Sequence, residues 1–234
     1  MTTEYTCEQY TPEWTRLRFG KPTASQFHLI ITPAGKPTDN RERRKYLFRL
    51  VAERLLEQAM DDGFESYWMK RGSDLEDQAL EAFVGLRNLG GRKVGFFTAM
   101  NDRVGASPDY VLEETVGIRL GTGLEIKCPA PYTQVEYLID GPGDKYKAQV
   151  QGQLFICNWQ FMHFWAWHPA MPPFHMVTGR DTVYIARLIS ALEQFCEEVD
   201  AAEAFARGKG AYRLAETLRL SDEMASVGNI LETL

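Results

Sequence analysis

The chain has 234 residues, of which 44% are hydrophobic and 25% are charged, a balance typical of a globular protein with a sizeable core. No apolar run approaches the roughly 20 residues that a membrane span requires. The N-terminus has no basic segment followed by an apolar run, so we expect no secretory signal and a cytoplasmic location. The simplest organisation is a single domain over residues 1–234, in which residues 208–234 form a peripheral C-terminal tail.

The charges are distributed unevenly along the chain. The formal net charge of −6 argues by itself against a nucleic-acid partner. Residues 16–54, however, hold ten lysines and arginines against three acids, whereas the chain from residue 190 onward holds four against nine. A basic N-terminal part is typical of a protein that presents one face to a polyanion. A helix with a solvated basic face would give the same pattern, so charge alone leaves both interpretations open.

Two short helices are predicted near the N-terminus. The first covers residues 12–19 and ends at Gly20, and the second begins after Thr23, a plausible N-cap residue. A helix N-terminus attracts anions, because its free N–H groups and its dipole both favour negative charge. Arg18 and Ser25 flank this position, which suggests a phosphate pocket. The alternative is ordinary helix capping beside a surface arginine.

Two longer helices follow. Asn40 can cap a helix over residues 41–60, whose apolar residues recur at a spacing of three and four. Residues 66–72 are expected to form a loop or frayed turn, and the next helix begins at Ser73. Ser73 and Glu76 have the spacing of a capping box, which is the structural interpretation of Glu76. Its functional interpretation is a third carboxylate near a metal ion.

The stretch from Val104 to Pro129 contains two β-like runs that carry acidic residues, Asp109 in the first and Glu125 in the second. Side chains two apart on a strand point to the same face, so Glu125 and Lys127 project together. If the two runs pair as a hairpin, Asp109 joins them. Two carboxylates and an ammonium group can bind a divalent metal and hold a water molecule beside it. The alternative is a turn at Asp109 and a weak, solvated ion pair between Glu125 and Lys127.

The rest of the chain alternates between strands and helices. Asp144 can cap a helix in which Gln149 and Gln153 lie one turn apart, and this polar face could meet the acidic strands or could be solvated. The order of the predicted strands and helices along the chain indicates an α/β (α+β) fold with a central mixed β-sheet flanked by helices. The other predicted elements are strands at 93–100, 159–167 and 174–178 and helices at 131–139, 144–156 and 181–207.

The cysteines and histidines show no spacing typical of a metal site or a redox motif. The cysteines are far apart, so we expect buried, reduced thiols. The histidines are scattered through the predicted strands, where core or edge positions are the expected role. The residues concerned are Cys7, Cys128, Cys157, Cys196, His163, His168 and His175.

Five short motifs occur in a fixed order along the chain. They are Trp14-x-x-x-Arg18-x-Gly20-x-x-Thr23-Ala24-Ser25, Gly72-x-x-x-Glu76, Ser107-Pro108-Asp109, Leu124-Glu125-Ile126-Lys127-Cys128-Pro129 and Tyr146-x-x-Gln149-Val150-Gln151. In this order they resemble the phage lambda exonuclease family, also described as YqaJ-type viral recombinases, within the restriction-endonuclease-like nucleases. The resemblance extends from Trp14 to the end of the 181–207 helix. The chain departs from it at Tyr110, where the family has glycine, and in a longer loop before Glu125.

The resemblance implies a restriction-endonuclease-like core and a magnesium-dependent exonuclease. The family's enzymes degrade the 5′-ended strand of linear double-stranded DNA and leave a 3′ overhang for phage-type recombination. By the same resemblance we expect two magnesium ions per site, which manganese can replace, and a ring-shaped homotrimer. A single-strand annealing protein is the expected partner, and the cytoplasm of a bacterial host is the expected location.

The resemblance also implies roles for individual residues. Asp109, Glu125 and the Ile126 carbonyl are expected to hold the metal, and Lys127 is expected to position or activate the attacking water. Glu76 is expected to be the helix-borne acid of the catalytic set, to which Gln149 also belongs. The positions expected around the 5′-terminal phosphate or the scissile group, and hence in contact with DNA, are Arg18, Ser25, Ser107 and Gln149.

Two other functions are compatible with these residues. An endonuclease on the same scaffold would share Asp109, Glu125 and Lys127 but would need no pocket for a terminal phosphate at Arg18 and Ser25. A non-catalytic scaffold that binds DNA ends would keep the fold. The acidic pair argues against this second alternative, because carboxylates near phosphate give a binding module only repulsion.

Overall fold

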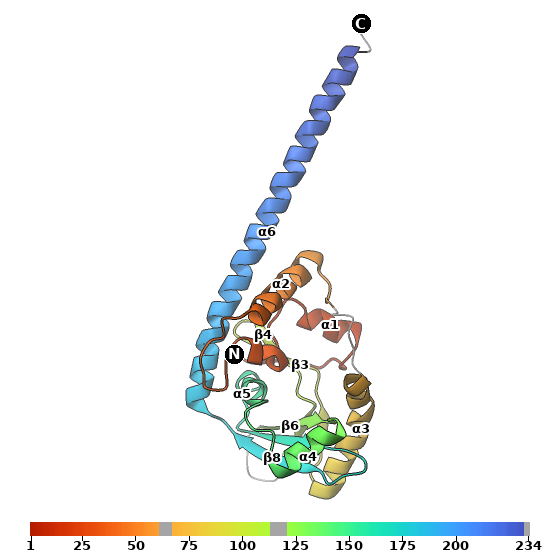
Figure 1. The fold of residues 1–234 in the computed structure, drawn as a ribbon, viewed down its shortest axis with the longest axis vertical. Helices are drawn as coiled ribbons and strands as arrows, with labels where there is room; N and C mark the ends of the chain where they lie inside the picture. The colour runs from red at the N-terminus through yellow and green to blue at the C-terminus, as the bar shows by residue number, and fades with distance from the viewer. Residues whose placement is uncertain (61–66, 113–120, 232–234) are drawn as a thin grey trace.

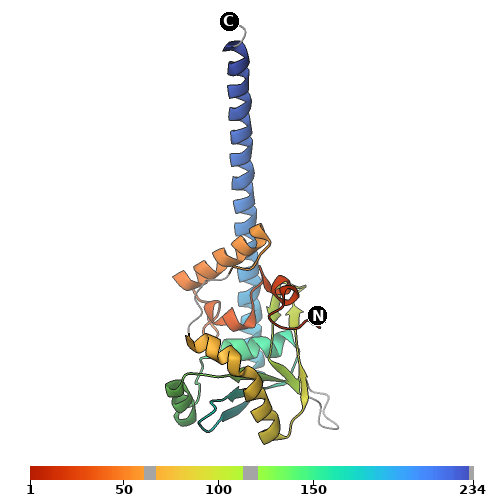
Figure 2. The ribbon, with the colours of Figure 1, turned by 90° about the vertical axis from the view of Figure 1, so that its right-hand side faces the viewer.

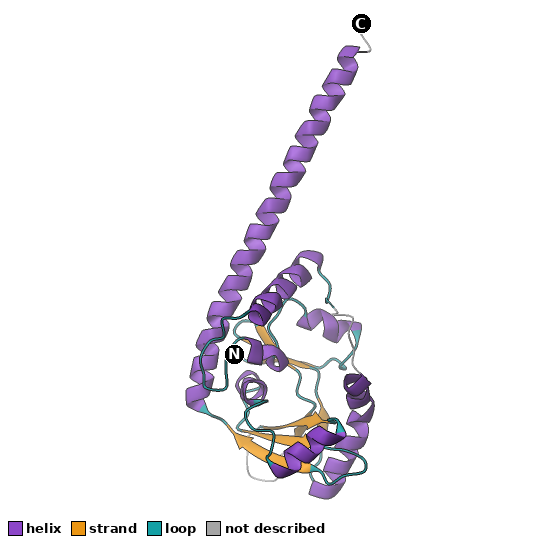
Figure 3. Ribbon diagram, viewed as in Figure 1, coloured by secondary structure: helices purple, strands orange, loops and turns teal. Residues whose placement is uncertain are grey.

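The computed structural model describes residues 1–60, 67–112 and 121–231. It contains a five-stranded mixed sheet, whose strands lie in the lower part of the molecule in Figure 3. The central pair, β6 and β7, is parallel, and the other neighbouring pairs are antiparallel. This arrangement confirms the predicted mixed sheet. In spatial order the strands are β2 (Gly91–Lys93), β5 (Tyr110–Leu112), β6 (Thr122–Lys127), β7 (Phe161–Ala166) and β8 (Phe174–Gly179).

A second, three-stranded sheet has the order β1 (Thr3–Tyr5), β3 (Phe96–Ala99) and β4 (Val104–Ala106). The prediction of one strand over 93–100 was therefore wrong, because β2 and β3 belong to different sheets. The break lies at Gly95, where a Cβ atom would come within 2.3 Å of the Cys7 carbonyl oxygen. The run that carries Asp109 is divided in the same way, because Pro108 has no N–H group with which to continue a ladder.

The N-terminal helices differ in part from the prediction. Helix α1 (Pro12–Arg18) is confirmed, with Thr11 accepting a hydrogen bond from the Trp14 N–H. The predicted helix after Thr23 is a 3-10 helix, η1 (Ala24–Leu29), and the Thr23 side chain does not cap it. Helix α2 (Arg41–Leu56) is capped by Asn40 as predicted. It ends before the predicted residue 60, because Glu57 adopts a left-handed conformation with φ of 52°.

Helix α3 (Tyr67–Arg87) begins before the expected loop at 66–72 has ended. The capping-box interpretation of Ser73 and Glu76 was therefore wrong, because both residues lie inside the helix. No proline interrupts this segment, and each of its two glycines, Gly72 and Gly85, costs only about 1 kcal/mol within a helix. Burial of Ala79 and Phe83 against the five-stranded sheet favours the helical state.

Helix α4 (Pro131–Ile139) agrees with the prediction, whereas α5 (Lys147–Ile156) begins later than predicted. Asp144 does not cap α5, because it lies in the preceding turn, where its carbonyl oxygen accepts the Lys147 N–H. Helix α6 (Thr182–Leu231) passes the predicted end at residue 207 without a break. Its C-terminal half projects away from the rest of the molecule in both views (Figures 1 and 2).

The basic N-terminal part and the acidic C-terminal part largely neutralise each other where α2 lies against α6. Arg43 forms an ion pair with Glu198, with an N–O separation of 2.6 Å, and Arg54 pairs with Asp200 at 2.7 Å and with Glu203 at 3.3 Å. Much of the charge asymmetry in the sequence therefore reflects packing between helices. Arg41 and Arg44, at the start of α2, remain exposed.

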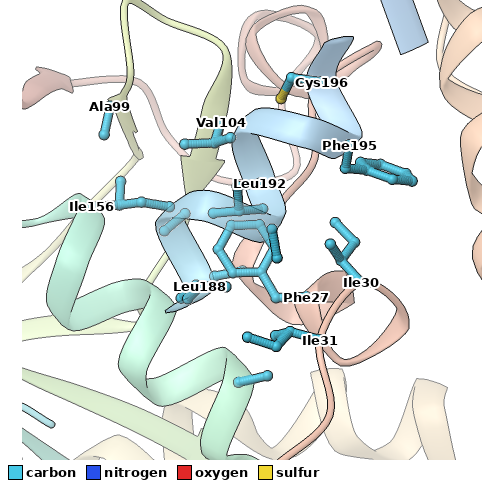
Figure 4. Close-up of a cluster of buried hydrophobic side chains, with 14 of the residues drawn as sticks. Phe27, Ile30, Ile31, Ala99, Val104, Ile156, Leu188, Leu192, Phe195 and Cys196 are labelled. Atoms are coloured by element: carbon cyan, nitrogen blue, oxygen red, sulfur yellow. The ribbon is translucent and has the colours of Figure 1, made fainter. Parts of the chain in front are cut away.

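The main hydrophobic core lies between the small sheet and the helices η1, α2, α5 and α6 (Figure 4). Phe27, Leu188 and Leu192 are fully buried at its centre. Helix α5 approaches η1 so closely that a Cβ atom at Gly152 would come within 2.5 Å of the Phe27 ring. All four cysteines are buried and free, as predicted. No helix in the described part of the chain is long and apolar enough to cross a membrane.

Phe27→Ala is expected to lower the free energy of unfolding by about 3–5 kcal/mol, because it removes contacts of a fully buried ring and leaves a cavity. Denaturant unfolding measures the loss. The matched control is Phe48→Ala, because Phe48 is 53% exposed and its removal should change stability by less than about 1 kcal/mol. Equal losses in the two variants would contradict the position of the core.

Candidate active site

Strand β6 presents two kinds of side chain on its two faces. Leu124 and Ile126 pack under α3, together with Phe83. Glu125 and Lys127 therefore point to the opposite face, as the period of a strand requires. The Lys127 ammonium group donates a hydrogen bond to a Glu125 carboxylate oxygen. The structure thus places these two residues together, as the sequence predicted.

Asp109 immediately precedes β5 and completes the hairpin between β5 and β6. Its N–H donates to the Leu124 carbonyl oxygen at 3.2 Å, and its carboxylate accepts the Ile126 N–H. The N–H and C=O of a strand residue point to the same side, so the Ile126 carbonyl also faces Asp109. The predicted hairpin is confirmed by the pairing of Tyr110 with Leu124, although its turn lies outside the described residues.

Glu125 is 2% exposed, yet its carboxylate is well supplied with hydrogen-bond donors. Besides Lys127, the side-chain amides of Gln149 and Gln153 donate to it from α5. The suggestion that the glutamine face of this helix meets the acidic strands is therefore correct. Gln153 was missing from the predicted site residues, although its spacing of four from Gln149 is the signal that identifies it.

Glu76 and Asp109 line the same cavity, which has a volume of about 340 Å³. Burial raises the pKa of the Glu76 carboxyl, and Glu125 adds to this effect while Lys93 and Lys127 oppose it. Helix α3 therefore brings a third carboxylate to Asp109 and Glu125. The interpretation of Glu76 as a third carboxylate near a metal ion stays a prediction.

The carboxylates strongly affect one another's protonation. Burial, Glu125 and Glu76 together raise the pKa of the Asp109 carboxyl well above its usual value. Burial favours the neutral amine of Lys127, but attraction to Glu125 and Asp109 outweighs this and raises the pKa of the ammonium group. Lys127 therefore stays protonated near neutral pH.

The donor set fits a hard divalent cation. No group of three or more His, Cys, Asp or Glu residues suitable for a metal occurs in the parts of the chain that the structure describes. Magnesium, however, needs only one or two protein carboxylates and completes its shell with carbonyl oxygen, water and phosphate. Asp109, Glu125 and the Ile126 carbonyl provide such a set. The repulsion that raises the pKa of Asp109 is the interaction that a cation would relieve.

Asp109→Asn is expected to raise the melting temperature in EDTA. A carboxyl whose pKa is raised by folding destabilises the folded state when ionised, and asparagine can still accept the Ile126 N–H. The gain should be complete above the raised pKa and should vanish as the pH falls below the ordinary pKa of Asp. Thermal unfolding measures it, with exposed Asp74→Asn as control. A lower melting temperature at neutral pH would contradict the electrostatic account.

A second cavity of about 580 Å³ lies beside α1 and contains Arg18 and Ser25. The Arg18 guanidinium lies over the Trp14 ring, 3.9 Å from its centroid, and burial lowers its pKa. Among the described residues, no carboxylate lies within ion-pair distance of Arg18. A partly buried guanidinium that pairs with none of the described carboxylates is suited to bind an external anion.

Ser107 forms a hydrogen bond with the Arg18 side chain and lies two residues before Asp109 in the sequence. Its hydroxyl oxygen accepts hydrogen bonds from Trp14 Nε1 at 2.8 Å and from Arg18 at 3.3 Å. These bonds use both lone pairs of the oxygen, so the O–H group is left to donate to an anion. The structure thus places Arg18 in contact with Ser107 and in one cavity with Ser25, while Gln149 lies at Glu125 instead.

His163 and His175 do not belong to this site. Their ring nitrogens lie 3.1 Å apart on β7 and β8, and both rings contact Phe83. Burial lowers the pKa of His175 to about 4 and also lowers that of His163. They are neutral, partly buried sheet residues near pH 7, in agreement with the predicted structural role.

Solved structures of nucleases are similar to this chain. An alkaline exonuclease from Laribacter hongkongensis has 26% identity and a TM-score of 0.75, over 86% of this chain and 99% of that chain. The same enzyme in complex with dAMP has a TM-score of 0.76. A phage-related exonuclease from Haemophilus somnus 129PT shares the fold, with a TM-score of 0.57 and 16% identity over 80% of this chain and 96% of that chain. The core is therefore restriction-endonuclease-like.

No protein of curated function matches the chain. The model of the YqaJ-like viral recombinase domain matches residues 13–160, which include all the predicted site residues. This match covers more than half of the chain. The chain therefore belongs to the YqaJ-like viral recombinase domain family.

Proposed function

We propose that this chain is a magnesium-dependent exonuclease that degrades the 5′-ended strand of linear double-stranded DNA. Family membership and the likeness to an alkaline exonuclease support a nuclease role in recombination. The observation that carries the proposal is that Asp109, next to Glu125 and Lys127, lines one cavity and Arg18 lines a second cavity, with Tyr10 lining both. The first group suits phosphodiester hydrolysis, and the second suits a terminal phosphate.

The metal-binding role falls to Asp109, Glu125 and the Ile126 carbonyl, with Glu76 as the further acid. The proposal includes two magnesium ions, for which manganese can substitute. A bound divalent cation supplies a Lewis acid for the phosphate and lowers the pKa of bound water. Gln149 and Gln153 fix the Glu125 carboxylate through its hydrogen bonds, so that its orientation does not depend on the substrate.

Lys127 acts as a hydrogen-bond donor in this proposal. Because its pKa is raised, it is not a general base near neutral pH. Its ammonium group can instead orient the attacking water and stabilise the negative charge that develops on the phosphate. Arg18, Ser25 and the Ser107 hydroxyl bind the 5′-terminal phosphate, which sets the distance from the DNA end to the scissile bond.

The proposal extends to the biological setting. The exonuclease would leave 3′ overhangs for recombination, hand them to a single-strand annealing protein and work as a ring-shaped homotrimer in the cytoplasm of a bacterial host. Membership of a viral recombinase family supports this setting. Size-exclusion chromatography with light scattering tests the trimer, for which the expected mass is three times 26.7 kDa.

Digestion of linear and covalently closed circular DNA separates the proposal from its alternatives. With magnesium or manganese the linear duplex should disappear while the circle survives, and EDTA should stop the reaction. Cleavage of the circle would favour an endonuclease. Survival of both substrates with either metal would favour the non-catalytic scaffold that binds DNA ends.

A further inference from the structure

Helix α2 contributes a buried carboxylate to the cavity that contains Arg18 and Ser25. Glu53 lines this cavity and is only 4% exposed. An acid is unexpected in a pocket that suits phosphate, because like charges repel each other. Its role is therefore to be found in the groups that its carboxylate holds.

Three donors occupy the Glu53 carboxylate. One oxygen accepts the Gly20 N–H at 2.7 Å, and the other accepts the Met60 N–H and the Arg49 Nε–H, both at 3.2 Å. The Arg49 guanidinium balances the negative charge, so the carboxylate does not prevent an anion from binding nearby. Loss of the carboxylate would leave the buried Gly20 N–H without this acceptor, which is unfavourable.

Glu53 and its neighbour Arg54 hold Gly20 from both sides. While Glu53 accepts the Gly20 N–H, the Arg54 Nε–H donates to the Gly20 carbonyl oxygen at 2.7 Å. Gly20 has a φ of 71°, and a Cβ atom there would come within 2.5 Å of the Arg54 Cγ atom. The turn at Gly20 is therefore fixed closely against α2, and a larger residue would displace it.

This turn determines how Arg18 and Ser25 lie relative to each other. Arg18 is two residues before Gly20, and Ser25 is two residues after Thr23. The Thr23 N–H donates to the buried Tyr46 hydroxyl at 3.1 Å, so α2 also holds the far end of the turn. Both ends of the segment that connects Arg18 to Ser25 are thus bound to one rigid helix.

We propose that Glu53 is a positioning residue that forms the pocket for the 5′-terminal phosphate before DNA binds. This inference rests on the proposed exonuclease function and adds a residue of α2 to it. By holding Gly20, Glu53 keeps Arg18 and Ser25 in one cavity, and donors that are ordered in advance bind an anion more tightly. Burial lowers the pKa of Arg18, and the negative charge of Glu53 opposes this effect, which favours the charged guanidinium.

A binding experiment with two DNA ends tests the role of Glu53. The ligands are duplexes with either 5′-phosphate or 5′-hydroxyl ends, and their affinities are measured by fluorescence anisotropy with calcium in place of magnesium. The proteins are the wild type, Glu53→Ala, Glu53→Gln and Gly20→Ala. Glu42→Ala is the matched control, because Glu42 lies on the same helix but is exposed and pairs with Lys45. Thermal unfolding shows whether each variant is folded.

The wild type and Glu42→Ala are expected to prefer the phosphorylated end by the same factor. Glu53→Ala should reduce this preference about tenfold, and Gly20→Ala should do the same by displacing the same turn. Glu53→Gln keeps one acceptor oxygen and should lose less. Because both alanine variants act on one turn, their double variant should lose no more than either alone. Affinity for the 5′-hydroxyl end should stay unchanged throughout.

An unchanged preference in Glu53→Ala would overturn the proposal, and so would equal losses of affinity for both ends, which indicate a merely structural role. If Glu53→Ala does not fold, Gly20→Ala and Glu53→Gln decide by the same criteria. Cleavage with magnesium tests the exonuclease function separately. A preference that depends on Glu53 without cleavage would contradict the exonuclease but support the positioning role. Cleavage by a wild type without any preference would do the reverse.

Discussion

Lys127→Ala is expected to lose DNA cleavage by a factor of about 10²–10⁴ while DNA binding is retained. The ammonium group is the one positive charge that contacts the Glu125 carboxylate among the described side chains. Its loss removes the donor that orients the attacking water, whereas Gln149 and Gln153 still satisfy Glu125. The fold should therefore survive the substitution. Single-turnover cleavage of an end-labelled duplex measures the rate, and a gel-shift or anisotropy titration measures binding.

Lys147→Ala is the matched control for this experiment. Lys147 lies on α5, near the active site in sequence, but its ammonium group faces Asp181 at 3.8 Å. This variant should cleave at close to the wild-type rate. A normal rate in Lys127→Ala would contradict its assigned role. Loss of DNA binding in Lys127→Ala would assign the residue to substrate binding instead.

Arg18→Ala is expected to lose the preference for 5′-phosphorylated over 5′-hydroxyl DNA ends. Hydrogen bonds to a charged group contribute about 1.5–3 kcal/mol, so the ratio of the two rates should fall by about 10- to 100-fold. Cleavage of the 5′-hydroxyl end should change much less, because the site at Asp109 and Glu125 is intact. Initial rates on the two substrates, measured for each variant, give this ratio.

Two further variants separate the roles of charge and geometry at Arg18. Arg18→Lys keeps the charge but loses the planar group that lies over Trp14, so it should recover only part of the preference. Arg16→Ala is the control on the same helix, because Arg16 is exposed and its side chain donates to the Pro12 carbonyl. An unchanged preference in Arg18→Ala would contradict the phosphate pocket.

The residues on β6 show what the sequence can predict about this site. The alternation along this strand correctly placed Glu125 with Lys127, because the period of a strand is fixed by backbone geometry. Asn40 was also correctly identified as a cap, because its hydrogen bond to Arg43 is local. In both cases the relevant contacts lie within a few residues of each other in the chain.

Long-range contacts explain where the sequence interpretation failed. The break at Gly95 depends on the N-terminal segment, whose Cys7 carbonyl approaches from far along the chain. The capping-box spacing at Ser73 was overruled by the packing of α3 on the sheet. The arginines of α2 suggested a polyanion surface, but acids more than 140 residues away neutralise two of them, Arg43 and Arg54. None of these contacts has a signal in the local sequence.

The position of Tyr10 between the two cavities is another long-range feature that the local sequence does not predict. Its left-handed backbone is not predicted by the residue type, since glycine or asparagine would be usual there. The resemblance to known nucleases identified Arg18, Ser107 and Asp109 from their motifs. Only the fold shows that one aromatic ring lines the cavities of both groups.

The most direct test of the account follows a linear duplex labelled at either its 5′ or its 3′ ends, with magnesium and with a closed circle as control. The account predicts that the 5′ label is released as mononucleotide at the earliest times, while the 3′ label stays on the strand and the circle remains intact. Earlier release of the 3′ label would contradict the assignment of Arg18 and Ser25 to a 5′-terminal phosphate. Cleavage of the circle would contradict an exonuclease altogether.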